Sequence, residues 1–112
     1  MPGDSTLVGG RPLEEVIRQI IAEVLVIAPG DVQPGKALVR DLGAESIDFL
    51  DLVFQLEDAL GFRIPIQRWQ QFTSVRLAGK DLSVVITPEV IQMFAEQEMQ
   101  EQEMREQELG EQ

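Results

Sequence analysis

An apolar stripe with a helical period over residues 13–25 constrains the fold of this chain more than any other feature. Its apolar side chains recur every three or four residues, and mostly polar or charged side chains lie between them. The members of the stripe are Leu13, Val16, Ile17, Ile20, Ile21, Val24 and Leu25. This spacing is typical of an α-helix that packs one face against a core. Pro12 suits the start of that helix, because an N–H group there has no acceptor within the helix. The pattern predicts a long first helix and an all-α fold.

Turn residues and further apolar patterns divide the remainder of the chain. Two Pro-Gly pairs make residues 28–45 a long ordered loop. A second helix is predicted over residues 46–60, a short third helix over residues 66–72, and a final helix from Thr87 onward. The side chains expected to point inward from the second helix are Ile47, Leu50, Val53, Phe54 and Leu56. Residues 73–86 mix turn signals with β-branched neighbours, and their pattern assigns no single element.

The negative charge of the chain is concentrated toward one end. The 112 residues have a formal net charge of −11, and residues 96–112 contribute −6 of it, from seven Glu and one Arg. This segment repeats the pattern EQEMQ, EQEMR, EQELG, whose five-residue period puts successive apolar residues on different sides of a helix. We therefore expect a flexible leader over residues 1–10, one domain over residues 11–95, and an acidic tail over residues 96–112 that is a frayed helix or disordered.

Composition also narrows the partners and the location. A strongly acidic surface repels nucleic acid and anionic membranes, whereas it attracts basic protein surfaces. No apolar run approaches the ~20 residues of a membrane span, so membrane insertion is not expected. The absence of Cys fits a reducing compartment. We expect a monomer in the cytoplasm.

Ser46 stands at the predicted start of the second helix, within the run Leu-Gly-Ala-Glu-Ser-Ile-Asp of residues 42–48. A helix N-terminus offers unpaired N–H groups and partial positive charge, and both stabilise a phosphate attached there. A catalytic serine would need a base, but the chain has no His, and nothing in the sequence puts either of its two lysines beside Ser46. No catalytic residue is expected, and a reactive group at Ser46 would have to be attached because neighbouring side chains do not supply one.

The run around Ser46 resembles the attachment site of acyl carrier proteins, whose usual pattern is L-G-x-D-S-L-D/E. The likeness covers roughly residues 13–94 and includes the turn Gly-Phe-Arg-Ile-Pro at residues 61–65. It implies a small four-helix acyl-carrier-like bundle with a long first loop and a short third helix. It also implies that a phosphopantetheinyl transferase attaches 4′-phosphopantetheine to Ser46. The thiol of that group would hold acyl intermediates as thioesters for enzymes of fatty-acid, lipid or polyketide-type biosynthesis.

The same resemblance assigns roles to other residues of the second helix. Acidic side chains there would dock basic patches on partner enzymes, and complementary charge would speed the encounter. These acids are Glu45, Asp48, Asp51, Glu57 and Asp58. The apolar pair Val53 and Phe54 matches family positions, and one of the two should line a cleft for the acyl chain. The acids lack the spacing of a calcium-binding loop, so no dedicated metal site is expected.

Two other functions remain open from the sequence. One is a carrier-like protein that is never modified and acts as an acidic adaptor. The other is an aminoacyl or peptidyl carrier of a non-ribosomal system. Trp69 in the third helix is expected to be a partly buried packing residue rather than a platform for a ligand.

Overall fold

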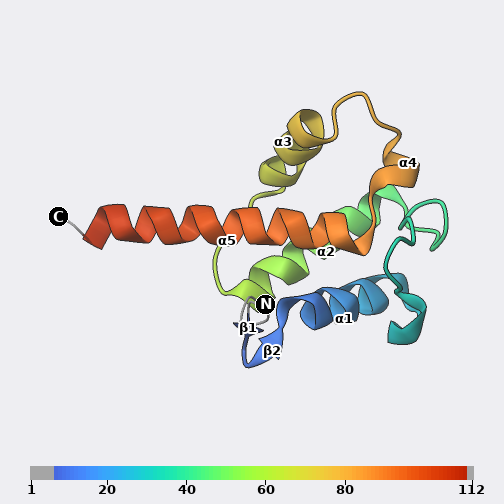
Figure 1. The fold of residues 1–112 in the computed structure, drawn as a ribbon, viewed down its shortest axis with the longest axis horizontal. Helices are drawn as coiled ribbons and strands as arrows, with labels where there is room; N and C mark the ends of the chain where they lie inside the picture. The colour runs from blue at the N-terminus through green and yellow to red at the C-terminus, as the bar shows by residue number, and fades with distance from the viewer. Residues whose placement is uncertain (1–6, 111–112) are drawn as a thin grey trace.

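Five α-helices and a short hairpin make up residues 7–110, the part of the chain that the computed structural model describes (Figure 1). The helices are α1 (Leu13–Leu25), α2 (Ser46–Leu60), α3 (Ile66–Arg76), α4 (Leu82–Val85) and α5 (Pro88–Gly110), with one 3₁₀ turn at Pro29–Asp31. The prediction of a mostly helical fold is confirmed. The count of helices differs from the expected four, because α4 forms a separate turn within residues 73–86.

Helix α1 packs against both α2 and α5, and the core lies between these three helices. Pairs of side chains three or four residues apart supply its centre, since such pairs share one face of a helix. The nearly inaccessible members are Ile17 and Ile21 from α1, Leu52 and Leu56 from α2, and Ile91 and Phe94 from α5. The stripe that predicted α1 is therefore the face that the helix buries.

A two-stranded antiparallel hairpin precedes α1, in a region that we expected to be irregular. Its strands are β1 (Leu7–Val8) and β2 (Arg11–Pro12), with Val8 opposite Arg11. Gly9 and Gly10 join the strands with φ angles of 60° and 85°. Tight two-residue turns need positive φ at both positions, which glycine adopts without a steric cost. The Gly-Gly pair was the sequence signal for this hairpin.

Helix α3 is longer than predicted and continues four residues past Phe72 to Arg76. The hydroxyls of Thr73 and Ser74 donate to the backbone carbonyl of Gln70 at 3.0 and 2.9 Å. These polar residues thus bond back into the helix and do not end it. Of the four added residues, Thr73 is half-buried, and Ser74, Val75 and Arg76 are exposed.

Helix α4 forms a single turn that begins after Asp81. The carboxylate of Asp81 accepts a hydrogen bond from the backbone N–H of Ser83 at 3.0 Å, in the manner of an N-cap. The segment then extends through the buried Ile86 into α5. The β-branched residues near position 85 therefore contribute to a helical turn and a linker.

Helix α5 continues without interruption across the expected boundary between residues 95 and 96. Just past that boundary, the carboxylate of Glu98 accepts a hydrogen bond from Nη2 of Arg68, on α3, at 2.8 Å. Glu98 is only 1% exposed, and Glu101 also pairs with Arg68. The start of the acidic repeat is thereby fixed to α3 by ionic contacts.

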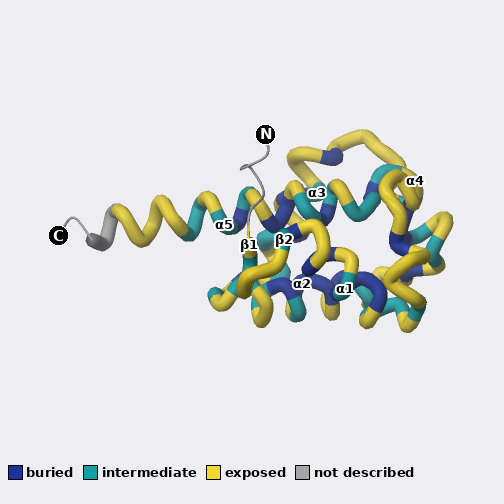
Figure 2. Tube along the Cα trace, turned by 60° about the horizontal axis from the view of Figure 1, so that its bottom comes forward, coloured by how far each residue is buried: buried dark blue, intermediate teal, exposed yellow. Residues whose placement is uncertain are grey.

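The remainder of α5 extends away from the bundle and is mostly exposed (Figure 2). Met99 packs partly against the core, whereas Met104, one repeat later, faces solvent. This difference follows from the five-residue period, which rotates successive apolar positions around the helix. None of the helices within residues 7–110 has an apolar stretch long enough to span a bilayer. The division into leader, domain and tail stays a prediction, and residues 1–6 and 111–112 lie outside the described part.

Candidate functional site

A tightly hydrogen-bonded loop sets the position at which α2 begins. The backbone N–H of Leu38 donates to the carbonyl of Ile86 at 2.9 Å, which ties the loop to the linker before α5. The N–H of Ala44 then donates to the carbonyl of Leu38 at 2.8 Å. Gly43 turns the chain between them with a φ of 79°, a conformation that glycine favours. Leu38 and Ala44 are both buried, so packing and hydrogen bonds together fix the end of the loop just before Ser46.

The carboxylate of Asp41 makes hydrogen bonds to two other residues of this loop. Its carboxylate accepts the backbone N–H of Ala37 at 2.9 Å and Nε of Arg40 at 3.1 Å. The hydrogen bond from Arg40, followed by that from Ala37, lowers the pKa of Asp41 below its usual value. The loop is thus organised by an ionised acid two residues before Gly43.

Ser46 is the first residue of α2, and its side chain is exposed. Glu45 before it is extended, with φ −109° and ψ 165°, and it forms a capping box with Asp48. In that box the carboxylate of Asp48 accepts the backbone N–H of Glu45 at 2.8 Å, and the N–H of Asp48 also donates to the carbonyl of Glu45 at 2.9 Å. The N–H groups of Ser46 and Ile47 have no acceptor in the described part of the chain. These N–H groups can donate hydrogen bonds to an anion that is attached to Ser46 or bound beside it.

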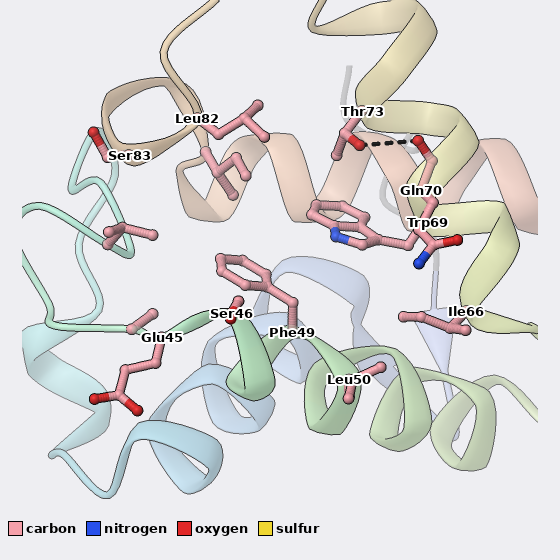
Figure 3. Close-up of a pocket in the computed structure, with 13 residues that line it drawn as sticks. Glu45, Ser46, Phe49, Leu50, Ile66, Trp69, Gln70, Thr73, Leu82 and Ser83 are labelled. Carbon is pink, nitrogen blue, oxygen red and sulfur yellow. Dashed lines mark hydrogen bonds between the residues drawn. The ribbon is translucent and has the colours of Figure 1, made fainter.

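An apolar pocket of about 510 Å³ opens directly beside Ser46 (Figure 3). Helix α2 forms one wall, α3 forms the opposite wall, and α4 with the loop before α2 closes the side. The lining residues are Val39, Ala44, Glu45, Ser46, Phe49, Leu50, Ile66, Trp69, Gln70, Thr73, Leu82, Ser83 and Ile86. Most of these side chains are apolar, so the pocket offers an attached group apolar walls to pack against.

The pocket does not use the two residues expected to line an acyl cleft. Val53 is buried in the core, and Phe54 is 68% exposed on the outside of α2. Phe49 and Leu50 take the lining positions because they lie one turn after Ser46 on the same side of the helix. Val53 lies a further turn along, where the core covers that side of α2. The role of Val53 or Phe54 at an acyl cleft stays a prediction, and the pocket beside Ser46 is lined on α2 by Phe49 and Leu50.

The predicted orientation of the apolar residues on α2 is wrong for three of the five. Val53 and Leu56 are buried as expected, but Ile47, Leu50 and Phe54 are exposed. These three lie at spacings of three, four and seven residues and form one apolar stripe on the outer side of α2. The inward positions belong to Phe49 and Leu52 together with Val53 and Leu56. The helix has apolar residues on both sides, and the sequence pattern alone did not separate them.

The five acids expected to dock partners fall into two groups. Glu45, Asp51 and Asp58 are exposed. Asp48 and Glu57 are half-buried and make local bonds: Asp48 to the N–H of Glu45, and Glu57 to the N–H of Ile64 at 2.8 Å. Within residues 7–107, the acidic side chains do not gather in threes in a way that could hold a metal ion.

Comparison with known protein families adds to this geometry. The family model described as phosphopantetheine attachment site, PP-binding, matches residues 15–78. The matched segment runs from the first turn of α1 to just past the end of α3. It includes Ser46 and the residues that α2 and α3 contribute to the pocket. Domains of this family are sites of covalent 4′-phosphopantetheine attachment and serve to tether that group. Because the match covers more than half of the chain, this protein belongs to the phosphopantetheine-attachment family of carrier domains.

Proposed function

We propose that Ser46 is the residue that carries 4′-phosphopantetheine, and that the chain is an acyl carrier protein. The observation that carries this proposal is the position of Ser46, exposed at the first residue of α2 and at the edge of an apolar pocket. When bound, the cofactor would supply a thiol that holds an acyl group as a thioester. Enzymes of fatty-acid, lipid or polyketide-type biosynthesis would act on that acyl group.

Only two serines lie within the segment that the family model matches, Ser46 and Ser74. Ser74 lies in the last two turns of α3, and its hydroxyl donates to the carbonyl of Gln70 within the same helix. The N–H groups near Ser74 are used by the helix itself, so they do not offer a phosphate any donors. Ser46 lies at the start of α2, where its own N–H and that of Ile47 have no acceptor among the described residues, and this favours Ser46 as the attachment residue.

The residues around Ser46 fit the chemical parts of the cofactor. The N–H groups of Ser46 and Ile47 and the positive end of the α2 dipole would stabilise the phosphodiester. The apolar walls would take the acyl chain, with Phe49 and Leu50 on α2 and Ile66 and Trp69 on α3 among the lining residues. A charged ammonium group would lose its hydration in such a space without gaining a partner. The pocket therefore favours acyl cargo over the aminoacyl cargo of a non-ribosomal carrier.

The outer side of α2 would dock the partner enzymes. It combines the exposed acids Glu45, Asp51 and Asp58 with an apolar stripe of Ile47, Leu50 and Phe54, which we call the outer stripe. The acids would steer basic patches toward Ser46, and the outer stripe would give short-range contact once the partner arrives. This surface suits a carrier that must visit a transferase and then several acyl-processing enzymes.

The test is co-expression with a broad-specificity phosphopantetheinyl transferase, followed by intact-mass measurement. We expect the wild-type chain and Ser74→Ala to gain the mass of one phosphopantetheine, and Ser46→Ala to gain nothing. Modification of Ser46→Ala, or no modification of the wild type, would contradict the proposal. In the second case the unmodified adaptor becomes the better function, and stable capture of a basic partner by the unmodified chain would support it.

A further inference from the structure

Trp69 brings an unused hydrogen-bond donor to the pocket beside Ser46. The side chain is 7% exposed, and its indole N–H has no acceptor among the described residues. None of the fully enclosed polar side-chain atoms in the described part of the chain lacks a partner. The indole N–H must therefore reach open space, and the pocket is the cavity that Trp69 lines. A buried Trp usually finds an acceptor for its N–H, so this donor is left free for a guest.

Aromatic neighbours hold the indole in one orientation. Phe49 stacks on it with ring centroids 5.6 Å apart and planes 10° from parallel. Phe94 meets it edge-on at 5.2 Å, and Phe72 packs at 5.6 Å. In Figure 3 the indole lies over the ring of Phe49, with its nitrogen on the edge nearer α2. The ring cannot turn to seek another partner without breaking these contacts.

The helix that carries Trp69 is fixed as well. Arg68, the preceding residue, bonds to the buried carboxylate of Glu98 through Nε at 3.1 Å and Nη2 at 2.8 Å. This bidentate pair joins α3 to α5 in a defined geometry. The direction of the indole N–H is thus set before any guest arrives, which lowers the entropic cost of binding one.

Two other side-chain donors of the pocket wall, the hydroxyls of Thr73 and Ser83, are already used. The hydroxyl of Thr73 donates to the carbonyl of Gln70, and that of Ser83 donates to Asp81 at 2.7 Å. Glu45 and Gln70 are exposed and lie where the pocket meets solvent. An apolar guest that filled the pocket would strip water from the indole N–H and leave it unpaired, which is unfavourable.

We propose that the pocket selects acyl groups that carry one hydrogen-bond-accepting oxygen, a keto or hydroxyl group, on an otherwise apolar chain. That oxygen accepts the indole N–H of Trp69, and the carbon skeleton packs against the apolar walls. Sites built to pair a polar group reject analogues that lack it, because the site's own polar atom is then unpaired. This inference rests on the proposed function, since it names the class of cargo that Ser46 would present.

The experiment uses the full chain loaded with stable thioether analogues of a β-keto acyl group and of the saturated acyl group of equal length. The chain has a single Trp, so the indole N–H gives one resonance in a ¹⁵N-correlated NMR spectrum. We expect a clear downfield shift and slower solvent exchange of this resonance with the β-keto group, and neither change with the saturated group. Equal spectra for the two cargos would overturn the proposal. This holds if neither cargo shifts the indole resonance, and also if both shift it by the same amount, because the keto oxygen would then not be the cause.

A matched variant gives a second readout. Trp69→Phe keeps an aromatic ring in the cluster and removes the N–H. With thioester cargo, the variant should release a β-hydroxy acyl group to hydroxylamine roughly two- to tenfold faster than the wild type, a factor that corresponds to one neutral hydrogen bond. The hydroxy group is used here because hydroxylamine would convert a keto group into an oxime. The variant should release the saturated group no faster than the wild type does. Equal acceleration for both cargos would mean that only packing was lost, and that result would contradict the donor role.

If the cofactor and its cargo cannot be attached, the intact mass will show it. That result would count against Ser46 as the attachment residue and not against the proposal for the pocket. The unmodified chain would then be titrated with a free medium-chain ketone and with the alkane of equal length. A shift of the indole resonance by the ketone alone would support the proposal. No shift with either compound, or the same shift with both, would overturn it.

Discussion

Helix α2 has apolar residues on two sides, and the two sides differ in what covers them. On the inner side, where α1 packs against α2, Leu52 and Leu56 are each 1% exposed. On the outer side, Leu50 is 49% exposed, within the outer stripe. The residue types are nearly the same, so hydrophobicity by itself does not tell a folding residue from a binding residue. What separates them is whether another helix of the same chain lies over them.

The largest effect that tests this comparison comes from truncating one leucine on each side. Leu52→Ala should lower the free energy of unfolding by roughly 2–5 kcal/mol, because it removes buried contacts and leaves a cavity. Leu50→Ala should lower it by about 0.5 kcal/mol or less, as expected for an exposed position. Urea denaturation followed by circular dichroism measures both. Similar losses for the two variants would break the distinction between the sides.

A second effect addresses what the outer stripe does. Phe54→Ala should reduce kcat/KM for phosphopantetheinyl transfer by about tenfold if Phe54 anchors the docked enzyme. Its unfolding free energy should not change. Val75→Ala on α3 is the matched control, since Val75 is equally exposed but lies outside the docking surface. If both variants are modified at the wild-type rate, the outer stripe does not take part in docking.

A third comparison, with smaller expected effects on stability, concerns two neighbouring acids of α2. Glu57→Ala should cost about 1–2 kcal/mol of stability, because the N–H of Ile64 loses its acceptor in a partly buried position. Asp58→Ala, one residue later, should leave stability within about 0.5 kcal/mol, because Asp58 is exposed. The measurement is again the urea midpoint at constant slope. A costly Asp58→Ala would show that the exposed acids also support the fold.

The smallest effect concerns pH and the loop before α2. The pKa of Asp41 is lowered in the folded protein, so the unfolded chain binds its proton first as the pH falls. The contribution of Asp41 is fully present above the unfolded Asp pKa of about 3.9 and is lost as the pH falls through the lower folded value. In stability measured against pH, Asp41→Asn should flatten the decline in this acidic range. An unchanged acid profile would mean that the loop does not depend on the ionised carboxylate.

Local patterns predicted the ends of α2 well, and the reasons are local. Ser46 begins the helix after a glycine turn, and Gly61 ends it in the left-handed conformation with a φ of 83°. The lengths of α3 and α5 were less predictable. Thr73 and Ser74 continue α3 by bonding to its own backbone, and Glu98 continues α5 as a packed helix because Arg68 on another helix pairs with it. Arg68 and Glu98 lie 30 residues apart in the chain, so no local window contains both.

The candidate site was predictable at its centre and not at its walls. The run around Ser46 pointed to the attachment chemistry because the motif is contiguous. The walls of the pocket come from the loop before α2, from α3 and from α4, and only their packing reveals that Phe49 and Trp69 face one space. The sequence led us to treat Trp69 as a packing residue. It does pack, but the cluster around it also directs its N–H toward the cavity.

The sequence by itself determined the helical character of this protein, the position of Ser46 at the head of a helix, and the excess of acid on the surface. These properties depend on residue type and on spacings of three and four, which operate within a turn or two of helix. Only the tertiary structure decided which side of α2 is buried, where the pocket lies and which donor remains free within it. Those outcomes depend on which distant elements cover a residue, and burial is a property of the whole packed chain.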